Sequence, residues 1–352
     1  MKKKLVTIAI AAAFAPAAAM ADVTVYGKLN ADFESVKNDR ATATKTSLNR
    51  VTSNTTYLGF KGKEDLGDGL AAIFQIETQI NLTNNTAAGG APFNVLRNSN
   101  VGLNGNFGTV FMGNWDSPFK AALGKIEGGM LKFANSTFAS SYALLGTNGN
   151  GISGFNGRMK QSVHYNSPKM SGFKANFAYG TDNQATNTTN KNVWSASGVY
   201  DEGPFYAALG YQKFNDVTAG NKDSGTRLVG AYNYGAGSVG LDIERLGQQV
   251  AGTTLDRNAW SLAANYITGA NHIAGFYTRA GDRTGTANSG ARQFTLRYGY
   301  NFSKRTELYG MYTNISNDTN GAYNFIAGDG TSVAGTAGSK LTGLGVGIAH
   351  AF

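Results

Sequence analysis

The sequence predicts an all-β protein whose strands form a closed antiparallel barrel that spans a membrane. Three observations lead to this prediction. Apolar residues recur at every second position, no apolar stretch after the leader reaches the length of a membrane helix, and short and long connections alternate. A period of two is that of a β-strand, because successive side chains point to opposite faces. In a membrane barrel one face meets lipid and the other meets the lumen, so mean hydropathy stays low.

The first 21 residues have the pattern of a secretory leader. Lysines occupy positions 2–4, an apolar run covers residues 5–15, and Ala-Met-Ala at positions 19–21 is a small-residue cleavage site. The apolar run is shorter than the roughly 20 residues that a membrane helix needs. We therefore expect residues 1–21 to be cleaved and residues 22–352 to form one domain.

The composition excludes several classes of protein. The chain has no cysteine, so an exported protein of this size is not held together by disulfides. Its formal charge of +9 includes the leader lysines, and no basic run follows the leader, which does not indicate nucleic-acid binding. It contains 47 glycines, 20 phenylalanines and 17 tyrosines. A large soluble all-β protein and an outer-membrane barrel both fit these traits.

The last strand, Lys340 to Phe352, has the clearest alternation. Counted back from Phe352, every second residue to Leu344 forms a largely apolar face, whereas the residues between them are glycine or alanine. A soluble edge strand would carry polar groups on its second face, but a barrel strand turns a small or polar face to the lumen. Taken alone, this strand also fits the edge of a soluble sandwich.

The same alternation predicts fifteen further strands. An even number suits a closed antiparallel barrel with both termini on one side. The sixteen predicted strands are residues 22–35, 49–63, 69–80, 96–106, 108–115, 158–168, 171–181, 191–201, 204–214, 225–235, 237–247, 257–268, 270–280, 291–302, 305–316 and 340–352.

The connections between these strands are of two kinds. Short ones, such as residues 65–68 and 303–305, alternate with long polar ones, such as residues 182–189 and 317–339. Tight turns at one end and long loops at the other are typical of outer-membrane barrels. A soluble sandwich has no physical reason to sort its connections in this way.

One connection, Asp116 to Gly157, is much longer than the others and alternates only weakly. A loop of this length in a compact fold is usually functional. A barrel of about sixteen strands has a water-filled lumen that its wall residues do not fill. The loop therefore either folds inward and narrows the lumen or projects outward from the surface.

Six short motifs, taken in their order and spacing, resemble those of a known family. They are Asp22-Val-Thr-Val-Tyr-Gly27, Tyr57-Leu-Gly-Phe-Lys-Gly-Lys-Glu-Asp-Leu-Gly-Asp-Gly69, Phe107-Gly-Thr-Val110, Ser162-Val-His-Tyr-Asn-Ser-Pro168, Asn301-Phe-Ser-Lys-Arg-Thr306 with Leu308-Tyr309, and Gly347-Ile-Ala-His-Ala-Phe352. The mature chain resembles the Gram-negative trimeric porins of beta-proteobacterial type over its whole length.

This resemblance implies a homotrimer of sixteen-stranded barrels in outer-membrane lipid. It implies passive diffusion of ions and small hydrophilic solutes, with residues 116–157 as a third external loop that folds into the pore. The terminal aromatic residue, Phe352, looks like the signal that the barrel-assembly machinery reads during biogenesis.

The family usually lines one wall of its constriction with arginines that face acidic groups on the inward loop, and the resulting field sets ion preference. This sequence departs from that pattern, because Tyr57, Phe111 and Asn114 stand at positions that are often basic and His164 replaces another. The basic side expected from the remaining residues is Lys28, Lys61, Arg97, Arg158, Lys160 and His164. The loop side expected is Asp116, Lys120, Lys125 and Glu127.

The ion preference expected from these residues is at most weakly anionic. The loop is not acidic, since its lysines outnumber its acids. Four acids on predicted lumen faces would partly cancel the basic wall, and each charge could also be an ordinary solvated lumen residue. These acids are Asp32, Glu77, Asp242 and Glu244.

No catalytic, metal-binding or cofactor motif is present in the sequence. The three histidines have no metal-ligand spacing, and Gly343-Leu-Gly-Val-Gly347 lies within a strand without the following helix that a phosphate-binding loop needs. We therefore expect no enzyme activity, no metal and no cofactor.

Three alternatives to a general diffusion channel stay open on the sequence. A substrate-specific porin would need an aromatic ladder, to which Tyr26, Tyr57, Phe111 and Trp115 could belong. An outer-membrane enzyme would need a Ser/His or Asp/His cluster at the lumen or lipid edge. An adhesin-like protein would act through its long loops.

Overall fold

The computed structural model describes residues 22–40, 47–83, 93–126, 138–147, 154–181, 191–216, 220–250, 252–326 and 335–352, so the expected leader lies outside the described residues. The strands are β1 (Asp22–Asn38), β2 (Ser47–Ser53), β3 (Tyr57–Gly67), β4 (Leu70–Ile80), β5 (Phe93–Leu96), β6 (Ser99–Gly105), β7 (Gly108–Asp116), β8 (Arg158–Asn166), β9 (Phe173–Gly180), β10 (Asn192–Glu202), β11 (Phe205–Asn215), β12 (Lys222–Asn233), β13 (Gly237–Val250), β14 (Thr253–Thr268), β15 (Asn271–Ala280), β16 (Ala291–Asn301), β17 (Thr306–Asn317) and β18 (Lys340–Ala351).

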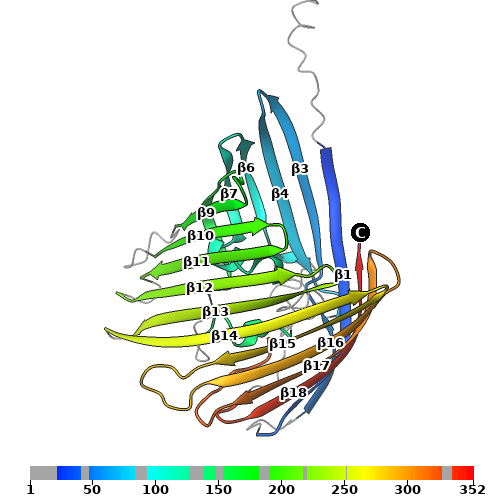
Figure 1. Ribbon diagram of the computed structural model, residues 1–352, viewed down its shortest axis with the longest axis vertical. Helices are drawn as coiled ribbons and strands as arrows, with labels where there is room; N and C mark the ends of the chain where they lie inside the picture. The colour runs from blue at the N-terminus through cyan, green and yellow to red at the C-terminus, as the bar shows by residue number, and fades with distance from the viewer. Residues whose placement is uncertain are drawn as a thin grey trace, which may run out of the picture.

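These strands form one closed antiparallel barrel (Figure 1). Apart from β2–β3 and β5–β6, neighbours in the chain pair with each other, and β1 also pairs with β18, with Lys28 opposite Ala351 and Asn38 opposite Leu341. β2 and β3 both pair with β1, and β5 and β6 both pair with β4, so each couple is one interrupted barrel strand. Counted this way, the barrel has the sixteen strands that the sequence predicts.

A side chain replaces the strand pairing where β2 and β3 are interrupted. Thr55 has a positive φ of 48°. The Thr56 hydroxyl accepts a hydrogen bond from the Asn30 amide at 3.0 Å and donates one to the Asn30 carbonyl at 2.9 Å. The backbone groups of β1 therefore stay satisfied across the break.

The two faces of the barrel wall differ in polarity. On β16, Leu296 and Tyr298 point outward and are half exposed, whereas the intervening Arg297 points inward and is buried. Large apolar side chains are exposed on the outer face throughout the ring of strands. This is the pattern expected where the outer face meets lipid and the inner face meets water or polar groups.

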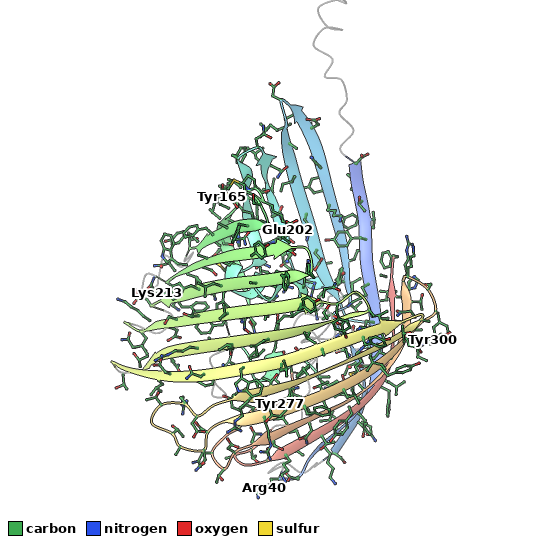
Figure 2. The ribbon with its side chains drawn as sticks, viewed as in Figure 1. Arg40, Tyr165, Glu202, Lys213, Tyr277 and Tyr300 are labelled. Carbon is green, nitrogen blue, oxygen red and sulfur yellow. The ribbon has the colours of Figure 1, made fainter. Side chains whose placement is uncertain are left out.

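Most connections sort by length to the two ends of the barrel (Figure 2), and the exception is the short link between β13 and β14 at the end with the long connections. Glu202 and Tyr300 lie near short turns, whereas Arg40 and Lys213 lie toward the end with the long connections. Aromatic side chains pair on the outer face near both ends, as in the aromatic girdles of membrane barrels. These pairs include Phe173–Tyr200 and Phe205–Tyr232 at the short-turn end, and Tyr179–Trp194 and Trp260–Tyr277 farther along the wall.

The described helices all belong to the connection between β7 and β8. They are α2 (Pro118–Ala121), α3 (Gly124–Ile126) and the 3₁₀ turn η2 (Ser141–Ala143). Ser117 begins α2 by accepting a hydrogen bond from the Lys120 amide at 3.1 Å, and proline follows it at the first helical position. None of the described helices has the length and apolar character required to cross a membrane.

The largest buried apolar cluster lies inside the barrel. Phe138 and Leu144 of the β7–β8 connection are completely buried there, together with Ile315 of β17 and Leu341 of β18. Figure 1 shows this teal connection behind β10–β14, within the ring of strands. The interior is therefore not an empty cylinder but is partly filled by a chain segment.

Candidate functional site

The described parts of the β7–β8 connection bond to inward-facing groups on distant strands. The Phe119 amide donates to Ser195 Oγ of β10 at 2.9 Å. Gln293 Nε2 of β16 donates to the Ser140 carbonyl at 3.2 Å, and the neighbouring Thr295 hydroxyl donates to the Ala139 carbonyl at 3.3 Å. These bonds hold the segment against the inner face of the wall on the side of β10–β16.

A fully buried charge cluster on β12–β14 lies beneath the same segment. Arg227 Nη2 lies 2.7 Å from Glu244 Oε2, and Arg257 Nη2 lies 2.5 Å from the other oxygen of Glu244. Arg227 also lies 3.3 Å from Asp242. Burying charged groups costs free energy unless they are paired and hydrogen-bonded, and each of these charges has a partner of opposite sign.

Backbone groups of the connection complete this cluster. The Gly146 amide donates to Glu244 Oε1 at 2.8 Å, and Arg257 Nη1 donates to the Leu144 carbonyl at 2.7 Å. Arg227 Nη1 donates to Asn156 Oδ1 at 2.9 Å, and its guanidinium lies 4.2 Å from the ring centre of Phe119. Charged side chains of the barrel wall therefore contact the connection near its start, at Phe119, and toward its end, at Leu144, Gly146 and Asn156.

The sequence reasoning missed Arg227 and Arg257 and identified only the two acids of this cluster. Alternation on β12 places Arg227 opposite the outward Leu228, so the same period of two could have identified it as a lumen residue. The connection between β17 and β18 also reaches this region, where burial raises the pKa of the Tyr323 phenol and the Arg257 guanidinium partly opposes that shift. Tyr323 therefore stays neutral beside the ion pairs.

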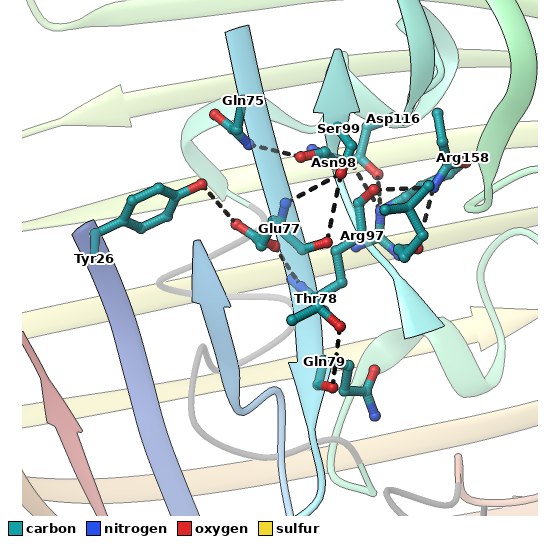
Figure 3. A network of polar contacts seen from close by, with 12 residues as sticks. Tyr26, Gln75, Glu77, Thr78, Gln79, Arg97, Asn98, Ser99, Asp116 and Arg158 are labelled. Carbon is teal, nitrogen blue, oxygen red and sulfur yellow. Dashed lines mark hydrogen bonds and ion pairs between the residues drawn. The ribbon is translucent and has the colours of Figure 1, made fainter. Parts of the chain in front are cut away.

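A second polar cluster lies where the connection leaves β7 (Figure 3). Asp116 accepts hydrogen bonds from Lys120 Nζ at 2.6 Å and from Asn98 Nδ2 at 3.2 Å. Arg158 Nε lies 3.5 Å from Asp116 and donates to Asn98 Oδ1 at 2.7 Å. Three of the predicted constriction residues, Asp116, Lys120 and Arg158, are thus in one network.

Arg97 and Glu77 extend the polar network toward β1 and β3. They form an ion pair, and Tyr26 donates a hydrogen bond to the second oxygen of Glu77 at 3.2 Å (Figure 3). The Arg97 guanidinium lies 5.0 Å from the ring centre of Tyr57. The Arg97 charge is therefore compensated by its neighbouring acid.

Two further predicted lysines lie on the inner face. Lys28 of β1 is in register with Tyr57 of β3. Lys61 of β3 is exposed, and its ammonium lies 5.1 Å from the ring centre of Tyr26. No acidic group lies within 4.0 Å of the Lys61 ammonium in the part of the chain that the structure describes.

His164 is buried in an aromatic group on the inner face. Its ring stacks on Phe111 with centres 4.8 Å apart and 8° between the planes, and its Nε2 lies 2.8 Å from Ser162 Oγ. The ring of Trp115 lies 5.3 Å from that of Phe111, centre to centre, with 68° between the planes. His164 is thus a packed aromatic residue of the wall.

The structure does not bring the other predicted residues to these clusters. Lys160 is exposed beside Ile76 and Met112 on the outer face of the barrel. The prediction that Lys160 lies on the basic side of the pore is therefore wrong. The pairing of β7 and β8 shifts at Gly113–Trp115, and the positive φ of Gln161 changes the alternation there. Lys125 is paired with Asp201 of β10, and Glu127 lies outside the described residues.

Asp32, another acid predicted to face the lumen, is buried in a group on β1, β2 and β17. It accepts hydrogen bonds from Thr52 at 2.6 Å and Asn54 at 2.5 Å, and from Tyr309 at 3.3 Å. Glu34 beside it is paired with Arg50 at 2.6 Å. This acidic pair is bound into the wall and does not face open solvent.

Phe352 joins the last strand to the first. Its amide donates to the Gly27 carbonyl, and its carbonyl accepts from the Gly27 amide, both at 3.1 Å. A Cβ added at Gly27 would lie 2.5 Å from the Phe352 ring, so only glycine at position 27 leaves room for this ring.

In the part of the chain that is described, no group of three or more His, Asp or Glu side chains is arranged to hold a metal ion.

Comparison with known proteins shows a consistent set of relatives. The family model for Gram-negative porins matches residues 7–320. The chain is 32% identical over the full length of both proteins to outer membrane porin protein 32 of Delftia acidovorans. It is 29% identical to the major outer membrane protein P.IB of Neisseria lactamica, over 87% of this chain and 91% of the relative.

Solved structures share the same barrel. The anion-selective porin from Comamonas acidovorans superimposes with a TM-score of 0.81 at 28% identity, over 94% of this chain and all of that one. OmpT of Vibrio cholerae superimposes with a TM-score of 0.68 over 94% of this chain and 99% of that one, and at 16% identity the match supports the fold alone.

Proposed function

This chain belongs to the Gram-negative porin family, and on that premise we propose how its lumen is narrowed and which ions it favours. It is an outer-membrane porin of a Gram-negative bacterium, through which ions and small hydrophilic solutes diffuse passively. The proteins of this family and fold are channels rather than enzymes.

We propose that residues 116–157 form the constriction. The observation that carries this proposal is the set of bonds from Phe119, Ser140 and Gly146 to inward-facing side chains of β10, β13 and β16. The described parts of the segment take up space along that side of the wall. The open pathway would then run between the segment and the opposite wall, which β1, β3 and β6–β8 form.

We infer a weak anion preference from the pairing of the lumen charges. Arg97, Arg158 and Arg227 each have an acidic partner within 4.0 Å, so their net fields are small. Lys61 has no acidic group within 4.0 Å among the described residues, and its ammonium lies 5.1 Å from the ring centre of Tyr26, so no paired acid offsets its field in the pathway. The anion-selective porin that shares this fold supports the same direction of preference.

We also propose that the functional unit is a homotrimer surrounded by lipid. Exposed apolar residues of the first and last strands, such as Val25, Val346 and Ile348, would suit a subunit contact as well as they suit lipid. Phe352 would provide the signal that the barrel-assembly machinery reads. Chemical crosslinking of the folded protein, followed by sizing, would show a trimer if this proposal is right and a monomer if it is wrong.

A thiol-labelling experiment tests the constriction directly, because the chain has no cysteine of its own. Ala121 of α2 is exposed and lines an interior cavity, so a charged thiol reagent on Ala121→Cys should lower the single-channel current. The matched control is Ala236→Cys in the short turn before β13, where the label should leave the current unchanged. An unchanged current through labelled Ala121→Cys channels would overturn the proposed constriction.

A further inference from the structure

Two interior cavities share Trp115, the residue of β7 that directly precedes the β7–β8 connection, and Pro118 and Ala121 of that connection line the second of them. The first has a volume of about 450 Å³ and is lined by Lys61, Lys63, Phe111 and Trp115, among others. The second has a volume of about 300 Å³ and is lined by Trp115, His164 and Lys174, among others. Trp115 and Asn166 line both cavities, so the two volumes adjoin along β7 and β8.

The aromatic side chains at this place are held in fixed positions. Phe111 is buried and contacts two rings, the stacked ring of His164 and the steeply inclined ring of Trp115. Trp115 itself is partly exposed to both cavities. An aromatic ring held in this way can stack on a planar ligand without losing much conformational freedom of its own.

The lysines around Trp115 differ from the other cations of the lumen. Arg97, Arg158 and Arg227 are neutralised by acids, but Lys61, Lys63 and Lys174 have no carboxylate within 4.0 Å among the described residues. Lys61 and Lys63 line the first cavity, and Lys174 lines the second. The two cavities therefore hold three lysines without a carboxylate partner among the described residues, although Asp22 also lines the first cavity and Asp116, which is paired with Lys120, lines the second.

A polar group in the first cavity also lacks a partner. The side-chain oxygen of Asn100 is buried and has no hydrogen-bond partner among the described residues. A buried polar atom without a partner costs free energy, which a bound hydroxyl or water could recover. The cavity thus offers an aromatic face, ammonium groups and one free acceptor.

We propose that the Trp115 cavities form a binding subsite for planar aromatic carboxylates on their way through the pore. The ring would stack on Trp115, and the carboxylate would meet Lys61 and Lys63 or, in the second cavity, Lys174. A neutral sugar would use the aromatic face but not the lysines, and a small inorganic anion would use the lysines but not the ring. This inference rests on the proposed pathway along the wall of β1, β3 and β6–β8.

Partial block of the ion current tests the subsite. Benzoate added to channels in a planar bilayer should lower the current at concentrations where acetate, which lacks the ring, and benzyl alcohol, which lacks the charge, have little effect. Trp115→Leu should weaken the apparent affinity for benzoate roughly two- to tenfold, as expected for the loss of one aromatic contact. Lys61→Gln should weaken it roughly two- to fivefold, as expected for one partly exposed charge.

Lys304→Gln is the matched control for the lysine variant. Lys304 lies in the exposed short turn between β16 and β17 and lines neither cavity, so this variant should bind benzoate as the parent does. If Lys61→Gln and Lys304→Gln change the apparent affinity for benzoate equally, Lys61 acts only through the overall charge of the protein, and the proposal is overturned. Block by acetate as strong as block by benzoate would overturn it as well.

Tryptophan fluorescence gives a second readout that does not depend on current. The protein has three tryptophans, and Trp194 and Trp260 are exposed on the outer face. With both replaced by phenylalanine, Trp115 is the reporter, and benzoate should quench it with saturation. If KCl conductance is normal but benzoate causes neither saturable quenching nor block, the subsite is contradicted and the diffusion pathway is not. If folded protein gives no conductance, the diffusion pathway itself is contradicted.

Discussion

Arg227 Nη2 and Glu244 Oε2 lie 2.7 Å apart inside the barrel, and both side chains are completely buried. The same carboxylate bonds Arg257 and the Gly146 amide, so the wall and the β7–β8 connection share one acidic group. A buried carboxylate with this many partners fixes the geometry around it, because any partner left alone would be an uncompensated buried charge.

Glu244→Gln should therefore destabilise the folded barrel and loosen the connection. Removing one partner of a buried ion pair costs about 3–5 kcal/mol. We expect the folded form to convert to the unfolded one at lower temperature on heated gels, and single-channel currents to become noisier.

The control for that variant is Asp256→Asn. Asp256 forms a 2.6 Å ion pair with Arg245, whose side chain is 67% exposed. Exposed pairs contribute about 0–1 kcal/mol, so this variant should behave almost as the parent does. Equal stability of the two variants would contradict a structural role for Glu244.

Glu77→Gln should increase the anion preference. Glu77 compensates Arg97, and its removal would leave the guanidinium charge facing the pathway beside Tyr57. The reversal potential in a KCl gradient should move toward the chloride potential. Glu202→Gln removes an acid that is exposed at the short-turn end, and it should move the reversal potential much less. If Glu77→Gln moves the reversal potential no more than Glu202→Gln does, or moves it toward the potassium potential, the result contradicts the proposed position of Arg97 beside the pathway.

Gly343→Val should displace the β7–β8 connection from β18. A Cβ at Gly343 would lie 2.4 Å from the Phe138 ring, far inside van der Waals contact. Overpacking of this kind costs about 1–3 kcal/mol, and melting of the folded barrel measures it. Gly198→Val is the control, because nothing lies within 4 Å of a Cβ at Gly198. If both variants melt with the parent, the Phe138 contact does not contribute to stability.

Deletion of Phe352 should lower the yield of folded barrel. The residue contributes two backbone hydrogen bonds between the ends of the first and last strands, and its ring lies over Gly27. Gel mobility of unheated samples reports the folded fraction. Phe302→Ala, at another exposed aromatic residue of the short-turn end, should fold in normal yield. Equal yields from both would argue against a special role of the terminal residue in assembly.

Alternation along the chain was sufficient to predict most of the wall, because in a barrel each residue's face follows from its neighbours two positions away. The sixteen strands and the inward positions of Asp32, Glu77 and Glu244 follow from that rule alone. The interruption at residues 54–56 does not, since it depends on Thr56 bonding to Asn30 across the sheet.

The face of Lys160 shows where the rule fails. The irregular pairing at Gly113–Trp115 and the backbone of Gln161 change the alternation in β8, and neither has a sequence signature. The strand residues that bond to the β7–β8 connection could not be predicted from the sequence either. Arg257 bonds to Leu144 over 113 positions of sequence, and no local pattern encodes that contact.

The central claim is that this porin is an open, segment-narrowed channel with weak anion preference, and single-channel recording in a KCl gradient tests it most directly. We predict stepwise currents that close in three equal levels and a small reversal potential on the chloride side. A reversal potential on the potassium side would contradict the inferred pairing of the lumen cations. Absence of any current from protein shown to be folded would contradict the channel itself.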